Sequence, residues 1–151
     1  MTANKNVNPA LKNLAFLPGK WSMTLSNTSF LPDPKATLHG SASFGWVEDG
    51  NFLVMQQGVK GKTPSATWLI GRDESVADYS VFYFDDKKSS RIYQMSFAKG
   101  VWKMWRTTPR FTQRFSARVS RDKKTIKGSW EKSTDGKKWD HDFDLTYERR
   151  S

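Results

Sequence analysis

Alternation of apolar and polar residues with a period of two is the feature of this sequence that most constrains its fold. The pattern is clearest in the last third, where Phe111, Phe115 and Val119 alternate with Arg114 and Arg118. Successive side chains of an extended strand point to opposite faces, so this period predicts strands buried on one face and solvated on the other. The sequence therefore predicts sheet structure with one apolar face.

Turn signals divide this pattern into about ten short strands. Pro18-Gly19 ends the first apolar run, and glycines at Asp49-Gly50, Lys99-Gly100 and Asp135-Gly136 mark hairpins because glycine tolerates the positive φ of such turns. Residues 61–65 are expected to form a mobile link. The expected strands span residues 20–26, 36–47, 52–58, 66–72, 79–85, 91–97, 101–107, 111–120, 125–131 and 139–149.

The predicted fold class is all-β, an antiparallel up-and-down β-barrel of about ten strands with a short N-terminal helix. We find no segment that would cross over between parallel strands, which favours a meander, and a long meander hides its edges best by closing. A short helix is expected over residues 8–14, because Asn8 can cap it and Pro9 suits its first position. Residues 1–7 are expected to be disordered, and residues 8–151 to form a single domain.

Composition narrows the classes of function. The chain has no cysteine, which excludes thiol catalysis and cysteine-based zinc sites and fits a reducing compartment. Its two histidines make no zinc motif, so no metal site is expected. We see neither a signal peptide nor a spanning helix, so a cytoplasmic protein without membrane insertion is expected.

The net charge of +10 raises nucleic acid and anionic ligands as partners. However, lysine pairs fall at expected hairpin tips, as in Lys87-Lys88, and single basic residues such as Lys103 and Arg114 fall on expected polar faces. This pattern favours a solubilising surface and makes nucleic acid an unfavoured partner. The seven tryptophans must instead line a core or a pocket.

The sequence Gly19-Lys20-Trp21, at the start of the first expected strand, resembles a pattern found in a known protein family. Gly-x-Trp at this position, an antiparallel barrel and a late arginine resemble the calycin superfamily of lipocalins, fatty-acid-binding proteins and their relatives. The sequence is more similar still to the bacterial DUF1579-type lipocalin-like proteins. The segments that carry this likeness are residues 17–21, 49–54, 69–73, 90–97, 130–139 and 141–147.

The resemblance implies a structural role for two residues and suggests one cofactor. By the lipocalin pattern, Trp21 packs at the closed end of the barrel, with Arg149 or Arg150 across its ring. Nitrobindin, a haem-binding relative, carries its axial histidine in the last strand, which invites comparison with His141. The opening strand departs from the glycine-rich opening of nitrobindin, so haem is a minority interpretation and no cofactor is the main expectation.

Two residues on expected inner faces are candidates for polar contact with a ligand. His141 alternates with Trp139 and Phe143, so it is either bonded to a neighbour in the core or in contact with a ligand. Arg106 follows Trp102 inward and would need an acidic partner or an anionic ligand, unless its strand is flipped or it lies at the rim. Fatty-acid-binding proteins anchor a carboxylate with arginines and a tyrosine, a part that Arg106 and Tyr93 could play.

The leading hypothesis is a barrel that binds a small, mostly apolar, possibly anionic molecule. The alternatives are an isomerase-type or cyclase-type enzyme on the same barrel, with His141 as its acid or base, a haem protein, and a basic nucleic-acid-binding sheet. We find no sequence motif typical of a known enzyme class. The sequence does not decide whether the protein forms a homodimer. The predicted ligand-binding residues are Gln57, Trp68, Tyr93, Trp102, Arg106, Gln113, His141 and Phe143.

Overall fold

The computed structural model describes residues 6–59 and 66–151 and contains one short helix and ten strands within them. The link expected at residues 61–65 and most of the N-terminal segment expected to be disordered lie outside the described residues. No helix in the described ranges is both long and apolar enough to span a bilayer. The elements are η1 (Pro9–Leu14), β1 (Gly19–Ser26), β2 (Leu38–Val47), β3 (Phe52–Val59), β4 (Ala66–Gly71), β5 (Tyr79–Asp85), β6 (Ser90–Ala98), β7 (Val101–Arg106), β8 (Thr112–Val119), β9 (Thr125–Ser133) and β10 (Asp140–Arg149).

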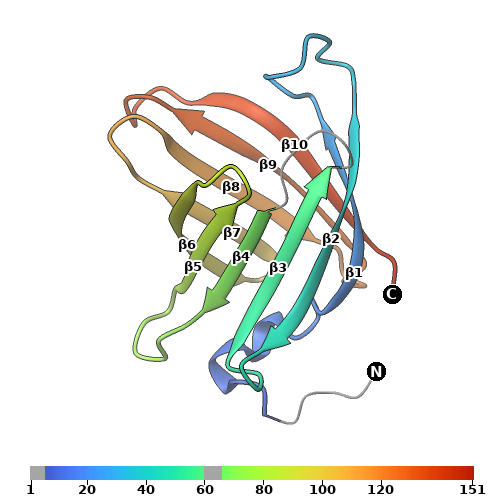
Figure 1. Ribbon diagram of the computed structural model, residues 1–151, viewed down its shortest axis with the longest axis vertical. Coiled ribbons are helices and arrows are strands. Elements are labelled where there is room, and N and C mark those ends of the chain that lie inside the picture. Colours follow the sequence, from blue (N-terminus) through green and yellow to red (C-terminus); the bar gives the residue numbers. More distant parts are fainter. Residues whose placement is uncertain (1–5, 60–65) are drawn as a thin grey trace.

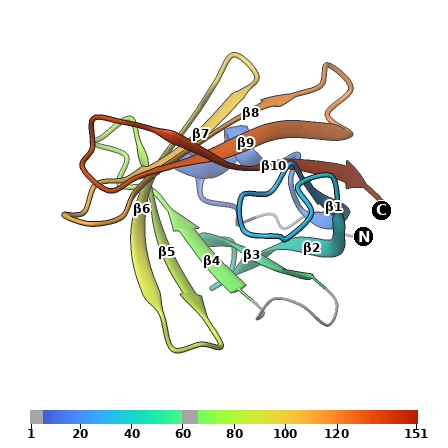
Figure 2. The ribbon, with the colours of Figure 1, turned by 90° about the horizontal axis from the view of Figure 1, so that it is seen from above.

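The strands form a closed antiparallel barrel in which each strand pairs with its neighbours in sequence (Figures 1 and 2). The barrel closes through β1 and β10, which pair from Trp21 with Arg149 to Ser26 with Asp144. This confirms the fold class predicted from the alternating pattern. Because the strands alternate in direction, the β1–β2, β5–β6, β7–β8 and β9–β10 connections all lie at one end, opposite η1 (Figure 1).

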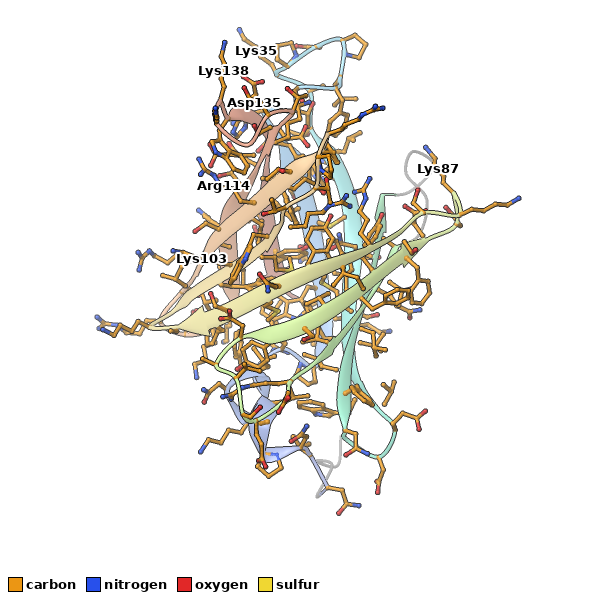
Figure 3. The ribbon with its side chains drawn as sticks, turned by 90° about the vertical axis from the view of Figure 1, so that its left-hand side faces the viewer. Lys35, Lys87, Lys103, Arg114, Asp135 and Lys138 are labelled. Atoms are coloured by element: carbon orange, nitrogen blue, oxygen red, sulfur yellow. The ribbon has the colours of Figure 1, made fainter. Side chains whose placement is uncertain are left out.

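The two-residue pattern places apolar side chains inside and basic ones outside. On β7, Trp102 and Met104 are buried whereas Lys103 is exposed. Figure 3 shows Lys103 and Arg114 pointing away from the barrel. The interior is therefore the apolar face that the sequence predicted.

The end of the barrel beside η1 is packed solid. Leu11 and Leu14 of this 3₁₀ helix are fully buried, and the Asn8 side chain accepts a hydrogen bond from the Ala10 amide, as expected for a cap. Trp21 donates from Nε1 to the Leu17 carbonyl at 2.9 Å. The Arg149 guanidinium lies 4.5 Å from the Trp21 ring centre and donates to the carbonyls of Phe16 and Pro18. Trp21 and Arg149 thus lie where the lipocalin pattern implied.

We expect Arg149→Lys to destabilise the barrel by about 1–3 kcal/mol, because an ammonium group cannot both cover the indole and bond two carbonyls. Urea denaturation measures this loss in the free energy of unfolding. Arg150→Lys is the control, because Arg150 is exposed and should change stability by less than about 0.5 kcal/mol. Equal stability of the two variants would show that the guanidinium does not hold this end together.

Two strand glycines provide a matched test of packing between β8 and β9. A Cβ on Gly128 would lie 2.3 Å from the Ser116 carbonyl oxygen and 2.5 Å from the Ala117 Cβ, whereas one on Gly45 would meet no described atom within 4 Å. We therefore expect Gly128→Ala to lower the thermal midpoint substantially and Gly45→Ala to leave it unchanged or slightly raised. Similar midpoints for the two variants, measured by circular dichroism, would contradict this account.

Candidate functional site

A cavity of about 310 Å³ occupies the end of the barrel opposite η1. Its floor is aromatic: the Trp68 ring centre lies 5.0 Å from that of Tyr93 and 6.1 Å from that of Trp130. The lining residues are Met23, Leu25, Phe30, Gln57, Gly58, Ala66, Trp68, Tyr83, Arg91, Tyr93, Phe111, Gln113, Trp130, Asp142, Phe143 and Leu145. A mostly apolar wall with a few polar groups is typical of a small-molecule site.

The main polar group of the cavity is a cluster of Arg91, Tyr93 and Gln113. Arg91 Nη1 donates to Gln113 Oε1 at 3.4 Å and lies 3.5 Å from the Tyr93 hydroxyl, which itself donates to Gln113 Oε1 at 2.7 Å. Because a guanidinium can only donate, the amide oxygen of Gln113 must face Arg91. The Arg91 guanidinium is further held between the rings of Tyr83 and Phe111, 5.5 and 5.3 Å from their centres.

Arg106 also lies near Tyr93. Its guanidinium is 6.0 Å from the ring centres of both Tyr93 and Phe111, and it donates to the Thr108 hydroxyl at 3.2 Å. Arg106 Nε is buried and has no hydrogen-bond partner in the described part of the chain. Among the described residues, no carboxylate oxygen lies within 4.0 Å of either guanidinium. Two guanidinium groups therefore lie near one tyrosine, and neither forms an ion pair with a carboxylate of the described residues.

The hydroxyl groups beside these cations stay protonated at neutral pH. Burial raises the pKa of Tyr93 above its ordinary value, against the opposing influence of Arg91. Burial, followed by the hydrogen bond to Asp85, also raises the pKa of Tyr83. The Tyr83 hydroxyl in turn lowers the pKa of Asp85, so that carboxylate is ionised and already accepts a bond from Tyr83 at 2.7 Å. The two tyrosine hydroxyls thus add no negative charge beside Arg91 and Arg106.

The β1–β2 connection lies across the mouth of the cavity and is fastened to β10. Ser29 donates to a carboxylate oxygen of Asp142 at 2.7 Å, and the Lys132 ammonium lies 3.5 Å from the same oxygen. The Phe30 ring packs edge-on against Phe143 with ring centres 5.8 Å apart. These contacts hold Phe30 in place as part of the cavity wall.

We expect Asp142→Asn to loosen this connection, because the amide cannot balance the charge of Lys132 and bonds Ser29 less strongly, at a cost of about 1–3 kcal/mol. Hydrogen exchange followed by mass spectrometry should show amides around residue 29 exchanging about 5–150-fold faster. Asp140→Asn, an exposed change two residues away, is the control and should leave this exchange unchanged. The same protection in both variants would exclude Asp142 as the fastener.

Five of the eight predicted ligand-binding residues line the cavity, namely Gln57, Trp68, Tyr93, Gln113 and Phe143. Gln57 accepts a hydrogen bond from the Tyr147 hydroxyl at 2.7 Å. Arg106 lies beside the cavity cluster rather than in the cavity wall. The expectation that Trp102 lines the cavity is wrong, because Trp102 lies deeper, buried against Phe115 and Tyr147.

The inward orientation predicted for His141 is also wrong. Its side chain is 46% exposed and pairs with Asp144 at 3.4 Å on the outer surface. The cause is a β-bulge: His141 pairs with Glu131 and Phe143 with Trp130, so Asp142 is an extra residue and the alternation changes face. Trp139, also expected inside, instead lies under Arg114, whose guanidinium is 3.9 Å from its ring centre.

This arrangement does not fit a haem held by a histidine in the cavity. His39, the other histidine of the chain, is exposed on β2 between Thr24 and Thr37. His141 lies outside the cavity, so neither histidine faces it to act as an axial ligand or as a proton-transfer group. In the described ranges there is also no group of three or more acidic or histidine side chains suited to a metal ion.

Arg91 is the functional candidate that the sequence interpretation did not include. It lies two residues before Tyr93 and four before Met95 on one expected strand, so the alternating pattern did place it on the same inner face. The signal was missed because Arg91 begins the strand, directly after the turn, where polar residues are ordinary.

Comparison with known proteins supports the fold. Protein-family models give no match to the sequence, and neither do curated proteins. The structure is similar to the crystal structure of Rv2717c from M. tuberculosis, with a TM-score of 0.62 and 14% sequence identity over 96% of this chain and 99% of that one. The closed antiparallel barrel fits a calycin-like fold.

Proposed function

We propose that this barrel binds a small, mostly apolar molecule that carries an anionic group. The charged group would lie at Arg91, and the apolar part against Trp68, Trp130 and Phe143. The observation that carries this proposal is the pair of guanidinium groups beside Tyr93, which have no carboxylate partner within 4.0 Å among the described residues, at the edge of an apolar cavity.

The energetics favour an anion over a neutral polar group. A guanidinium withdrawn from water needs an opposite charge to offset the lost hydration. A carboxylate would supply charge-assisted hydrogen bonds, each contributing about 1.5–3 kcal/mol, and can be held by the two donors of one guanidinium. Burial of the apolar part would add about 25 cal/mol for each Å² removed from water.

We further propose a carrier role rather than catalysis, in a cytoplasmic protein related to the DUF1579-type lipocalin-like proteins. The position of His141 outside the cavity removes the group on which the enzyme hypothesis relied. The absence of cysteine and the residue patterns shared with that family support the location and the kinship.

Decanoate and 1-decanol form a matched pair of probes that differ in charge. We expect decanoate to bind the wild-type protein at least about tenfold more tightly than 1-decanol, as one charge-assisted bond would provide. Arg91→Gln should remove this preference by weakening only decanoate binding. Tryptophan fluorescence titration measures both affinities, because Trp68 and Trp130 line the cavity.

Arg118→Gln is the matched control, since it removes the same charge from an exposed position on the outer face of β8. It should leave both affinities unchanged. Equal binding of the two probes by the wild-type protein, or the same loss in both variants, would contradict the proposed role of Arg91.

A further inference from the structure

Strands β6 and β7 separate from each other at the end of the barrel that holds the cavity. The ladder between these strands runs from Ala98 with Val101 to Gln94 with Trp105. On its other side β6 stays paired with β5 as far as Phe84 with Ser90. Residues 90–93 of β6 therefore extend past the last residue pair with β7, and Figure 2 shows the β5–β6 hairpin pointing away from β7 and β8.

A groove of about 540 Å³ lies on the outside of the barrel at this division. Arg91 lines both this groove and the inner cavity, and Arg106 lines the groove. The outer groove and the inner cavity therefore meet at Arg91, and Arg106 lies on the groove side. The groove is lined by Phe82, Ser90, Arg91, Ile92, Gln94, Trp105, Arg106, Thr107 and Thr108.

The outer rim of this groove is unusually apolar. Ile92 is 64% exposed and Phe82 is 42% exposed, and the two pair directly across β5 and β6. Large apolar side chains grouped at a surface hollow typically mark a binding position. With two arginines at its base, the hollow suits a molecule that has an apolar part and an anionic group.

The axial mouth of the barrel is a less suitable entrance. Phe30 and Phe143 pack together there, and Asp142 fastens the β1–β2 connection through Ser29. The ion pair of Asp142 with Lys132 leaves no net positive charge there to attract an anion, whereas the lateral groove presents the guanidinium groups of Arg91 and Arg106.

We propose that an amphipathic anion enters the cavity laterally, between β6 and the β7–β8 connection, with the groove as its external binding position. Arg106 would receive the anionic group first and Arg91 would hold it inside. This inference rests on the proposed function, because it concerns access to the same cavity.

Ile92 provides the test because it lines the groove and not the cavity. A residue that the ligand contacts only during entry changes the free-energy barrier to binding. It does not change the free energy of the bound protein or of the free protein. Both the association and the dissociation rate should then change by one factor, and the Kd should stay constant. We expect Ile92→Gln, which adds no charge beside Arg91, to slow both rates for decanoate at least about threefold, with the Kd within twofold of wild type, in stopped-flow tryptophan fluorescence.

Two controls accompany this measurement. Val76→Gln makes a similar apolar-to-amide change at a position that is 52% exposed, in the β4–β5 connection at the η1 end, and should leave both rates unchanged. Ser29→Ala loosens the fastening at the axial mouth without changing a cavity residue, and should also leave both rates unchanged.

Rates in Ile92→Gln equal to those in Val76→Gln would overturn the lateral route. So would a rise of both rates in Ser29→Ala, which would make the axial mouth the entrance, or a weaker Kd in Ile92→Gln caused by faster dissociation alone. The affinity difference between decanoate and 1-decanol tests the proposed function separately, because it depends on the bound state and not on the route.

Discussion

The pairing of β1 with β10 is the interaction on which the rest of this structure depends. Without it, the meander would be an open sheet with two unpaired edges and an apolar face in water. The seam brings Trp21 opposite Arg149, and the guanidinium of Arg149 holds the chain between η1 and β1 through the Phe16 and Pro18 carbonyls. The contacts of Trp21 and Arg149 therefore both close the barrel and hold the chain that fills its η1 end. Closure in turn makes the inner faces of the strands enclose one common interior.

The two ends of that space differ in how they are filled. Near η1, Leu11, Leu14 and Leu17 complete a dry core. At the opposite end, Trp68, Tyr93 and Trp130 form a floor above which space remains. Arg91 and Arg106 lie near Tyr93 there, and no carboxylate oxygen of the described residues lies within 4.0 Å of either guanidinium, an arrangement that costs folding free energy through desolvation. Such a cost beside a cavity is the physical basis of the proposed ligand site.

The sequence predicted the fold because strand alternation and turn chemistry are local properties. It placed Trp68, Tyr93 and Gln113 in the cavity for the same reason. His141 was misplaced because a bulge reverses the alternation, and its inserted residue, Asp142, has no local mark in the sequence. Trp102 was correctly placed inside the barrel but at the wrong position along its axis. Alternation shows which face of the sheet a residue occupies, but it does not show which part of the interior is packed and which part is a cavity.

The bulge at Asp142 makes the distribution of charge in the interior asymmetric. It adds a carboxylate, already balanced by Lys132, to a cavity whose other charged group is the Arg91 guanidinium on β6. An elongated guest with a single negative end therefore has two unequal ways to lie in the barrel, and the electrostatic difference favours the one with that end at β6. Under the proposed function, one inserted residue on the closing strand would thus help to set the orientation of the bound molecule.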